Sequence, residues 1–362
     1  MNVMVFSASI GHGHNQVAEA LAQEAKRQGH TVQLIDGLDF VSPFLSKVLL
    51  ESYLKMLRYT PSVYGKLYQW TEEPMLYDFT SVINKLLCRK FKRLLTQHRP
   101  DAILCTHSFP AGLLSALKLR LNAPVRLVAA VTDFTVHYTW VNPAIDTYVL
   151  ASHKLVPLIR QLGVPEAALA PLGIPIRPQF ATPPSKSEAR LALGLSHRPT
   201  VLLMGGGLGM GTPSEMVRLL DSSLADCQII VLAGTNEALL RELKAARFVN
   251  PVMVLGFVEN VEVYMAAADV LVTKPGGVTC AEALAMAVPL VFVSPIPGQE
   301  WRNSTFLVEN LAAIHFDEST LAPKLADLIY DEVRLSCMSR MARELARPHA
   351  ARDIVELLAP SS

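Results

Sequence analysis

The first segment whose side chains could do chemistry is a glycine-rich turn with two histidines, Ser7-Ala8-Ser9-Ile10-Gly11-His12-Gly13-His14-Asn15. It follows a short apolar run and precedes a segment with helical periodicity. We therefore expect it at the carboxyl end of a strand, where open α/β sheets bind ligands, and its glycines would let a ligand approach the backbone. Gln16 stands where the dinucleotide-binding pattern G-x-G-x-x-G has its third glycine, so the support for a dinucleotide site is weak.

His14 is the candidate general base in this turn. At the start of a helix, the positive end of the helix dipole disfavours imidazolium, and a neutral imidazole can accept the proton of an attacking hydroxyl. Two alternatives stay open from the residues alone. One is a capping histidine, and the other is a metal pair of His12 and His14, for which no third ligand is near in the sequence.

A second glycine tract, Met204–Pro213, follows another strand-like run and has five glycines in seven positions. It is not a P-loop, because no Gly-Lys-Ser/Thr follows the glycines. Its backbone N–H groups could hold an anion, or the missing side chains could make room for a bulky ligand.

Two later motifs could bind a phosphate, a ribose and sugar hydroxyls. Lys274–Glu282 turns at Gly276 and Gly277 into a helix start that could hold a phosphate, and the carboxylate of Glu282 could bind a ribose diol. Thr279 and Glu282 also have the spacing of a capping box, so a purely structural role is equally consistent. Pro295–Glu300 ends on an amide and a carboxylate, Gln299 and Glu300, which together could bind several sugar hydroxyls.

These motifs require strands to position them, and short apolar runs do alternate with helix-period segments along the whole chain. A stretch containing Pro and Gly, Gly173–Pro178, precedes the polar Thr182–Ser187 and predicts a linker. The predicted fold class is α/β, with two doubly wound, Rossmann-like domains in tandem. The expected strands are Val3–Ala8, Thr31–Ile35, Ala102–Cys105, Val125–Val131, Thr147–Leu150, Thr200–Met204, Gln228–Leu232, Val252–Leu255, Val270–Thr273 and Pro289–Val293; the expected helices include Asn15–Gln28, Ser214–Leu224 and Ala238–Ala246.

The composition indicates a globular protein that contacts something apolar. The 362 residues are 51% hydrophobic and 18% charged, with a mean hydropathy of +0.29, yet no apolar run is long enough to span a bilayer. The N-terminus lacks the charged region of a signal peptide, and the five widely spaced cysteines form no C-x-x-C pair. We therefore expect a cytoplasmic protein that is peripheral to a membrane.

The charge is divided unevenly. Residues 1–175 carry 17 basic and 12 acidic side chains, whereas residues 176–362 carry 16 and 20, so the first half is the one suited to an anionic surface. Within it, Phe40–Trp70 interleaves aromatic and apolar residues with lysines and arginines, which suits a helix at a lipid headgroup boundary. An ordinary amphipathic helix packed on its own domain is the alternative. A second basic stretch, Lys85–Arg93, is equally consistent with a solvated helix face.

Taken together, these motifs resemble the processive diacylglycerol glucosyltransferases and monogalactosyldiacylglycerol synthases, a family similar to glycosyltransferase family 28. The resemblance runs from Val3 to about Ala313. The residues that carry it are Gly11-x-Gly13-His14-x-x-x-Ala18, Val131-Thr132-Asp133-Phe134, Gly173-Ile174-Pro175-Ile176-Arg177-Pro178, Lys274-Pro275-Gly276-Gly277-x-Thr279-x-x-Glu282-Ala283 and Pro297-Gly298-Gln299-Glu300. It implies a GT-B fold with an interdomain cleft, in which residues 1–175 face the acceptor and membrane, residues 176–345 bind the UDP-sugar, and residues 346–362 form a C-terminal helix packed on the first domain.

The resemblance also implies roles for individual residues. His14 would be the catalytic base, and Asp133 would orient it or bind the acceptor hydroxyl. The implied donor-binding residues are Gly13, Arg177, Gly206, Gly207, Gly209, Phe257, Val258, Lys274, Gly276, Gly277, Thr279, Glu282, Gln299 and Glu300. The implied acceptor and membrane residues are Phe44, Tyr53, Lys55, Tyr64, Trp70, His137 and Trp140.

The implied reaction is inverting transfer of glucose or galactose from a UDP-hexose to the 3-hydroxyl of diacylglycerol or a glycosyl-diacylglycerol, at the cytoplasmic face of the cell membrane. No cofactor, metal or nucleic acid is expected. The alternatives are a UDP-sugar epimerase of related fold, a transferase acting on a lipid-linked peptidoglycan precursor, and a non-catalytic sensor of nucleotide sugars. Gly205–Gly211 looks more like the plant galactosyl enzymes and Lys274–Gly277 more like the bacterial ones, which leaves the hexose open.

Overall fold

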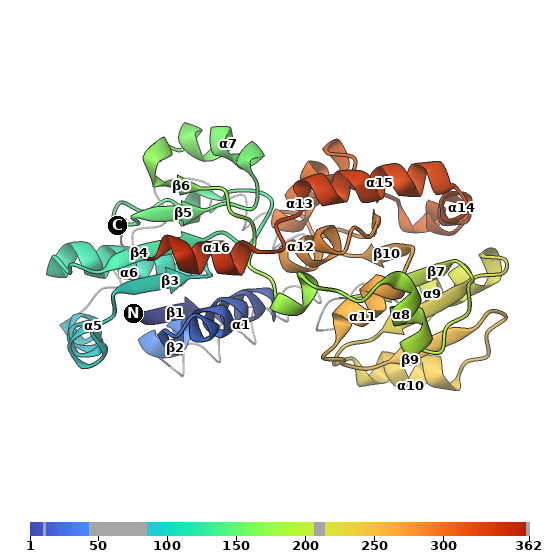
Figure 1. Cartoon of the computed structure of the whole chain (residues 1–362), viewed down its shortest axis with the longest axis horizontal. Coiled ribbons are helices and arrows are strands. Elements are labelled where there is room, and N and C mark those ends of the chain that lie inside the picture. Colours follow the sequence, from blue (N-terminus) through green and yellow to red (C-terminus); the bar gives the residue numbers. More distant parts are fainter. Residues whose placement is uncertain (10–11, 43–84, 206–213, 360–362) are drawn as a thin grey trace. The chain divides into compact units, whose positions relative to one another are not determined.

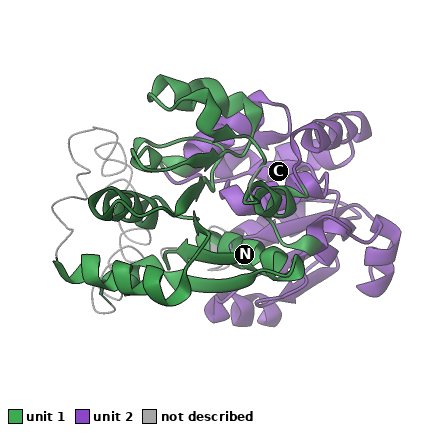
Figure 2. Cartoon of the chain, turned by 60° about the vertical axis from the view of Figure 1, so that its left-hand side comes forward, with its two compact units in different colours: residues 1–178, 297–299, 348–362 green, residues 179–296, 300–347 purple. Residues whose placement is uncertain are grey.

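The structure is a computed structural model, and it describes residues 1–9, 12–42, 85–205 and 214–359. The chain divides into two compact units, coloured green and purple in Figure 2. Unit 1 comprises Met1–Pro178, Pro297–Gln299 and Pro348–Ser362, and unit 2 comprises Gln179–Ile296 and Glu300–Arg347.

Unit 1 is built on a six-stranded parallel sheet with the order β2-β1-β3-β4-β5-β6 (Figure 1). The strands are β1 (Asn2–Ser7), β2 (Thr31–Asp36), β3 (Ala102–Cys105), β4 (Arg126–Ala130), β5 (Thr147–Val149) and β6 (Leu169–Ala170). The helices in its described residues are α1 (His12–Arg27), α2 (Gly37–Val41), α5 (Lys85–His98), α6 (Ser108–Leu121), α7 (Val156–Gln161) and α16 (Ala350–Leu357), with short 3₁₀ turns at η3 (Tyr138–Trp140), η4 (His153–Leu155) and η5 (Glu166–Ala168). The turn η6 (Pro178–Phe180) begins at the last residue of this segment and continues into unit 2.

Unit 2 contains a second six-stranded parallel sheet, with the order β12-β11-β10-β7-β8-β9. Its strands are β7 (Thr200–Met204), β8 (Gln228–Leu232), β9 (Val252–Leu255), β10 (Val270–Thr273), β11 (Leu290–Phe292) and β12 (Ala313–His315). The helices of this part of the chain are α8 (Lys186–Ala192), α9 (Ser214–Ser223), α10 (Glu237–Ala245), α11 (Val261–Ala267), α12 (Gly277–Ala285), α13 (Gln299–Glu309), α14 (Glu318–Ile329) and α15 (Glu332–Leu345).

Both sheets have the burial expected of strands covered by helices on both faces. All five residues of β7 and of β8 are buried, and so are all four of β3 and of β10. Such strands appear in the sequence as continuous apolar runs rather than as alternating patterns. The predicted fold class, two Rossmann-like parallel-sheet domains, is confirmed.

The last helix returns to the first sheet, since α16 packs on α1 within unit 1 (Figure 1). Arg126 Nη1 donates a 2.7 Å hydrogen bond to the carbonyl oxygen of Leu357, at the end of α16. This bond satisfies one of the carbonyls that a helix C-terminus leaves without an intrahelical partner.

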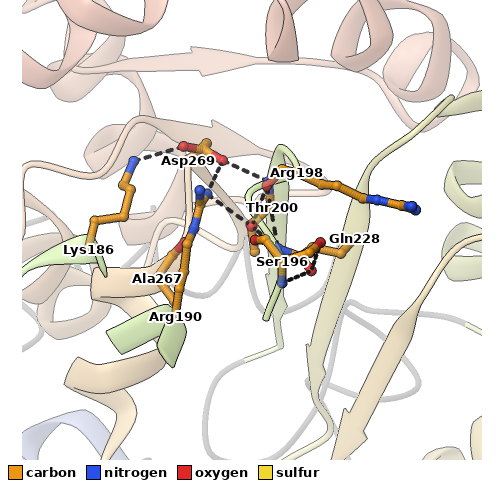
Figure 3. A network of polar contacts seen from close by, with 8 residues as sticks. All are labelled: Lys186, Arg190, Ser196, Arg198, Thr200, Gln228, Ala267 and Asp269. Atoms are coloured by element: carbon orange, nitrogen blue, oxygen red, sulfur yellow. Dashed lines mark hydrogen bonds and ion pairs between the residues drawn. The ribbon is translucent and has the colours of Figure 1, made fainter. Parts of the chain in front are cut away.

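A polar network joins the amino ends of β7, β8 and β10 (Figure 3). Its centre is Asp269, which accepts 2.7 Å hydrogen bonds from Arg190 Nη2 and the Thr200 N–H, and a 2.8 Å bond from Lys186 Nζ. Gln228 Nε2 donates to Thr200 Oγ1 at 2.9 Å. Ligands of parallel sheets bind at the opposite, carboxyl edge, so this network stabilises the unit rather than binding substrate.

Replacing Asp269 with alanine should therefore destabilise the protein by about 2–4 kcal/mol, because it leaves the largely buried Arg190 guanidinium without its carboxylate. Denaturant unfolding followed by circular dichroism measures the change. Glu242→Ala on α10 is the matched control, since the Arg218–Glu242 pair is exposed and should contribute little. Equal midpoints for the two variants would contradict this assignment.

Candidate functional site

In unit 1 the candidate site lies where the strand order reverses. β1 lies between β2 and β3 in the sheet. The chain continues from β1 to β2 on one side and from β3 to β4 on the other, so it leaves the adjacent strands β1 and β3 in opposite directions. The carboxyl ends of such a pair flank a crevice where open α/β sheets bind ligands. The turn before His14 follows β1, and Thr106 and His107 follow β3.

The His14 ring is held by hydrogen bonds to the residues that follow β3 and β4. Nδ1 lies 2.8 Å from the carbonyl oxygen of Thr106 and 3.1 Å from Thr132 Oγ1. A carbonyl oxygen only accepts, so Nδ1 must carry the ring proton. In the neutral ring Nε2 is then the unprotonated nitrogen, which is the form that a general base requires.

The environment of His14 keeps the ring neutral. Burial lowers the pKa of His14 below its ordinary value, and it outweighs the opposing effects of the nearby Asp133 carboxylate and of the hydrogen bond to Thr106. Asp133 is half-buried in the segment that follows β4, and it is close enough to act electrostatically on the His14 ring. The two predicted catalytic residues therefore come together in unit 1, on the segments after β1 and β4.

A chain of hydrogen bonds anchors the two ends of the glycine turn. Ser7 Oγ donates to Asn15 Oδ1 at 2.6 Å, and the Asp36 carboxylate accepts the Ser9 N–H at 2.8 Å and the Ser9 hydroxyl at 2.5 Å. Gly37 follows directly, and a Cβ there would lie 2.8 Å from Pro110 Cβ. The turn is thus fixed to the end of β2 and to the start of α1, which holds His14 in place.

Two residues of this site, Thr106 and His107, were not among the sequence predictions. Thr106 is fully buried; its carbonyl accepts from the His14 ring, and its hydroxyl donates to the His14 main-chain carbonyl at 3.0 Å. The His107 ring centroid lies 4.5 Å from that of His14, with the ring planes at 69°. The sequence signal that could have found them is their position: both are polar residues that come just after the buried, apolar strand Ala102–Cys105.

The remaining predicted residues of unit 1 are spread over later loops. His137 and Trp140 are buried at 7% and 5% exposure around η3, where His137 Nδ1 accepts the Thr139 N–H. Because both side chains are buried, they could contact an acceptor only if the acceptor enters the interior of unit 1. Arg177 is half-buried directly before η6, after Gly173 with its positive φ of 104°. The glycine permits a left-handed turn that most residues avoid.

In unit 2 the strand order reverses between β7 and β10, which are adjacent although β8 and β9 separate them in the sequence. The predicted donor residues follow four strands of this sheet. The tract with the predicted Gly206, Gly207 and Gly209 begins at Gly205 after β7, Phe257 and Val258 follow β9, Lys274–Gly277 follow β10, and Gln299 and Glu300 come after β11. Parallel strands present these segments at one edge of the sheet. Phe257 is 61% exposed there.

The turn after β10 leads into α12, whose N-cap is Gly276. Thr279 is then the third residue of the helix, so the capping-box interpretation of Thr279 and Glu282 is wrong. Glu282 lies in the second turn of α12 and is 5% exposed. Because α12 begins at the carboxyl edge of the sheet, its first N–H groups suit an anion there.

Two side chains connect the β10 turn with α13. Glu300 lies 3.9 Å from Lys274 Nζ and accepts the Ile296 N–H at 2.9 Å. Asn303 is fully buried and donates from Nδ2 to the Pro275 carbonyl at 3.0 Å. Asn303 was also not predicted, because only the fold shows that α13 packs on this turn. The Lys-Pro-Gly-Gly segment and the start of α13 are thereby held together.

Several predicted residues lie outside the described ranges: Gly206, Gly207, Gly209, Phe44, Tyr53, Lys55, Tyr64 and Trp70. Gly13 is described, as the second residue of α1. Among the described residues, no three His, Cys, Asp or Glu side chains are grouped so that they could hold a metal ion. In the same ranges every helix is too short or too polar to cross a membrane.

Comparison with known proteins agrees with this arrangement. Residues 14–176 match the family described as monogalactosyldiacylglycerol (MGDG) synthase, and residues 200–358 match the glycosyltransferase family 28 C-terminal domain. The chain is 30% identical over 360 residues to a processive diacylglycerol beta-glucosyltransferase of Bacillus pumilus, covering 98% of this chain and 93% of that one.

Solved structures show the same fold at lower identity. MurG of Acinetobacter baumannii superposes with a TM-score of 0.67 at 19% identity, and HepE of Anabaena in complex with UDP-glucose superposes with a TM-score of 0.59 at 16% identity. Each comparison covers 99% of both chains.

The two Rossmann-like units and these matches define a GT-B glycosyltransferase. Within that class, the chain belongs to the family of the processive diacylglycerol glucosyltransferases and monogalactosyldiacylglycerol synthases. The resemblance predicted from the sequence motifs is thereby confirmed.

Proposed function

We propose that this glycosyltransferase moves a glucose or galactose from a UDP-hexose to the 3-hydroxyl of 1,2-diacylglycerol or of a glycosyl-diacylglycerol, with inversion at the anomeric carbon. The observation that carries the proposal is the state of His14: a neutral ring with Nδ1 bound to the Thr106 carbonyl and Nε2 left to accept a proton. The names of the relatives support a lipid acceptor, and the HepE complex supports a UDP-sugar donor.

The chemical step follows from these assignments. His14 Nε2 accepts the proton of the acceptor hydroxyl as its oxygen attacks the anomeric carbon. The bond from that carbon to the β-phosphate oxygen breaks on the opposite side, so a single displacement inverts the configuration and releases UDP. Asp133 stabilises the imidazolium that forms, consistent with its electrostatic effect on His14.

The proposed donor residues named next, which belong to unit 2 apart from Arg177 and Gln299, would stabilise the leaving UDP. The N-terminus of α12 and the Lys274 ammonium offer positive charge at the carboxyl edge of the second sheet, and Arg177 would add a guanidinium. Glu282 would bind the ribose, and Gln299 with Glu300 the hexose hydroxyls. We propose that this set replaces a divalent metal ion in the reaction.

The acceptor lipid requires access to a membrane, and α5 has a face suited to an anionic one. Leu87 and Phe91 are buried against unit 1, whereas the opposite stripe is exposed. That exposed stripe consists of Lys85, Leu86, Arg89, Lys92 and Arg93. The helix contains no acidic residue, and none of these four cations pairs with a carboxylate in the part of the chain that the structure describes. Together with five free cysteines, which suit a reducing compartment, this favours peripheral binding at the cytoplasmic face.

Neutralising Arg89, Lys92 and Arg93 to glutamine should weaken binding to vesicles that contain phosphatidylserine. Each removed charge should weaken the binding about fivefold at low salt, because a basic residue near such a surface contributes ~1 kcal/mol. Vesicle sedimentation measures the change. Arg334 and Arg340 are exposed on α15, and their replacement by glutamine is the control that should leave vesicle binding unchanged. Equal losses in both sets would contradict docking through α5.

The donor and acceptor can be tested by incubating the protein with UDP-glucose, UDP-galactose or UDP-N-acetylglucosamine, with and without vesicles that contain diacylglycerol. We expect UDP to be released only when diacylglycerol is present, and from only one of the three donors. Recovery of an epimerised UDP-sugar without UDP release would instead favour an epimerase. Equal UDP release with and without diacylglycerol would point to another acceptor.

A further inference from the structure

His107 occupies a position that its capping role alone does not explain. It lies two residues after the end of β3 as the N-cap of α6, and its Nδ1 accepts the Phe109 N–H at 3.0 Å. Nδ1 is therefore unprotonated, and the neutral ring carries its proton on Nε2. Short side chains such as Asn, Asp and Ser cap helices well, so a cap alone does not require an imidazole.

The same ring packs against the proposed base. The His107 and His14 centroids are 4.5 Å apart at 69°, an edge-to-face arrangement that aromatic rings favour. Thr106, between β3 and His107, holds the other side of the His14 ring through its carbonyl oxygen. Residues 106 and 107 therefore contact the His14 ring at two places, one by a hydrogen bond and one by packing.

We propose that His107 is a positioning residue, whose ring holds the His14 imidazole in the orientation that keeps Nδ1 on the Thr106 carbonyl and Nε2 available to the acceptor hydroxyl. The inference rests on the proposed role of His14 as the base. The helix cap fixes the tautomer and rotation of His107, so the contact that His14 meets is itself rigid. A base displaced by a fraction of an ångström loses rate without losing substrate affinity.

The charge state of both rings agrees with this arrangement. Burial lowers the pKa of His107 well below its ordinary value, and proximity to His14 lowers it further. Near neutral pH His107 is thus uncharged, and its effect on His14 is steric and orientational. Among the described residues, the titratable groups that act on the His14 ring are Asp133 and His107 itself.

Two substitutions separate the cap from the ring. His107→Asn retains a side-chain acceptor for the Phe109 N–H but removes the ring, whereas His107→Phe retains a ring but removes the acceptor. We expect His107→Asn to fold with nearly unchanged stability and to lose about tenfold or more in kcat at unchanged KM for the UDP-sugar. His107→Phe should retain most of kcat while its unfolding midpoint falls.

The ¹⁵N chemical shifts of the His14 ring give a readout that does not depend on turnover. Wild type should show one tautomer, protonated at Nδ1, and His107→Asn should show a mixture of tautomers. Wild-type kcat and a single tautomer in His107→Asn would overturn the inference and leave His107 as a cap. Equal loss of kcat in both variants, with the His14 tautomer unchanged, would also overturn it, because the His107 N–H would then act on substrate directly. If His14 is not the base, His14→Ala keeps its turnover, while the tautomer measurement still tests the positioning.

Discussion

Replacing His14 with alanine is expected to lower kcat by about 10²-fold or more, the usual contribution of a general base, while the affinity for UDP stays unchanged. The reason is the separation of roles between the units. His14 lies after β1 in unit 1, whereas the segments proposed to bind UDP follow strands of unit 2, apart from the one that holds Arg177. Steady-state kinetics measure kcat, and calorimetric titration with UDP measures the affinity.

His12→Ala is the matched control, because it removes a histidine from the same turn. If His14 alone is the base, this variant should have near-normal turnover. Equal inactivation of both variants would instead favour the metal-pair interpretation of His12 and His14. Normal turnover in His14→Ala would remove the residue from the mechanism.

The pH profile of kcat/KM checks the same assignment. The base acts only when it is neutral, so activity must fall as pH drops through the pKa of His14. Since burial lowers that pKa, the midpoint of the decline should lie below pH about 6.5, the ordinary value for histidine. Asp133→Asn removes an effect that raises the pKa of His14, and it should move the decline to still lower pH. A decline centred above the ordinary value in wild type would contradict a neutral His14.

The second large effect is expected at Glu282. Glu282→Gln retains the size of the side chain but exchanges a carboxylate for an amide, so it weakens the proposed hydrogen bonds to the ribose diol. Hydrogen bonds to a charged group contribute about 1.5–3 kcal/mol, which corresponds to a loss of UDP affinity of about 10- to 100-fold. Calorimetric titration with UDP measures it directly.

Asp221→Asn is the control for Glu282, because Asp221 is another buried carboxylate of unit 2. It accepts the N–H groups of Val249 and Asn250, before β9 and therefore at the other edge of the sheet. This variant should lose stability and keep its UDP affinity. If Glu282→Gln binds UDP as wild type does, Glu282 has a structural role.

Much of the fold could be predicted because its strands are buried on both faces. Runs such as Thr200–Met204 and Val270–Thr273 are apolar except for one terminal threonine each, and they end at glycine- or proline-containing turns, so the predicted bounds agree with β7 and β10. β6 and β12 were not predicted. They have two and three residues, too few for a pattern to distinguish them from loops.

The candidate site was only partly visible in the sequence, for a physical reason. His14 and Glu282 stand in glycine-rich motifs that have a local pattern. Thr106 contacts the His14 ring across 92 positions of sequence, and Asn303 reaches Pro275 across 28. These contacts arise because the order of the strands in the sheet brings distant segments together, and no local sequence pattern shows that order. The capping box failed because Thr279 has the right spacing but lies inside α12, after the true cap at Gly276.

The most direct test of the central claim is the structure of the lipid product. Wild type and His14→Ala are each incubated with diacylglycerol vesicles and UDP-hexose, and the anomeric configuration of the extracted glycolipid is read from its proton NMR coupling. We expect a β-linked hexosyl-diacylglycerol from the α-linked donor, made by wild type and nearly absent with His14→Ala. An α-linked product, or equal amounts of glycolipid from both proteins, would contradict it.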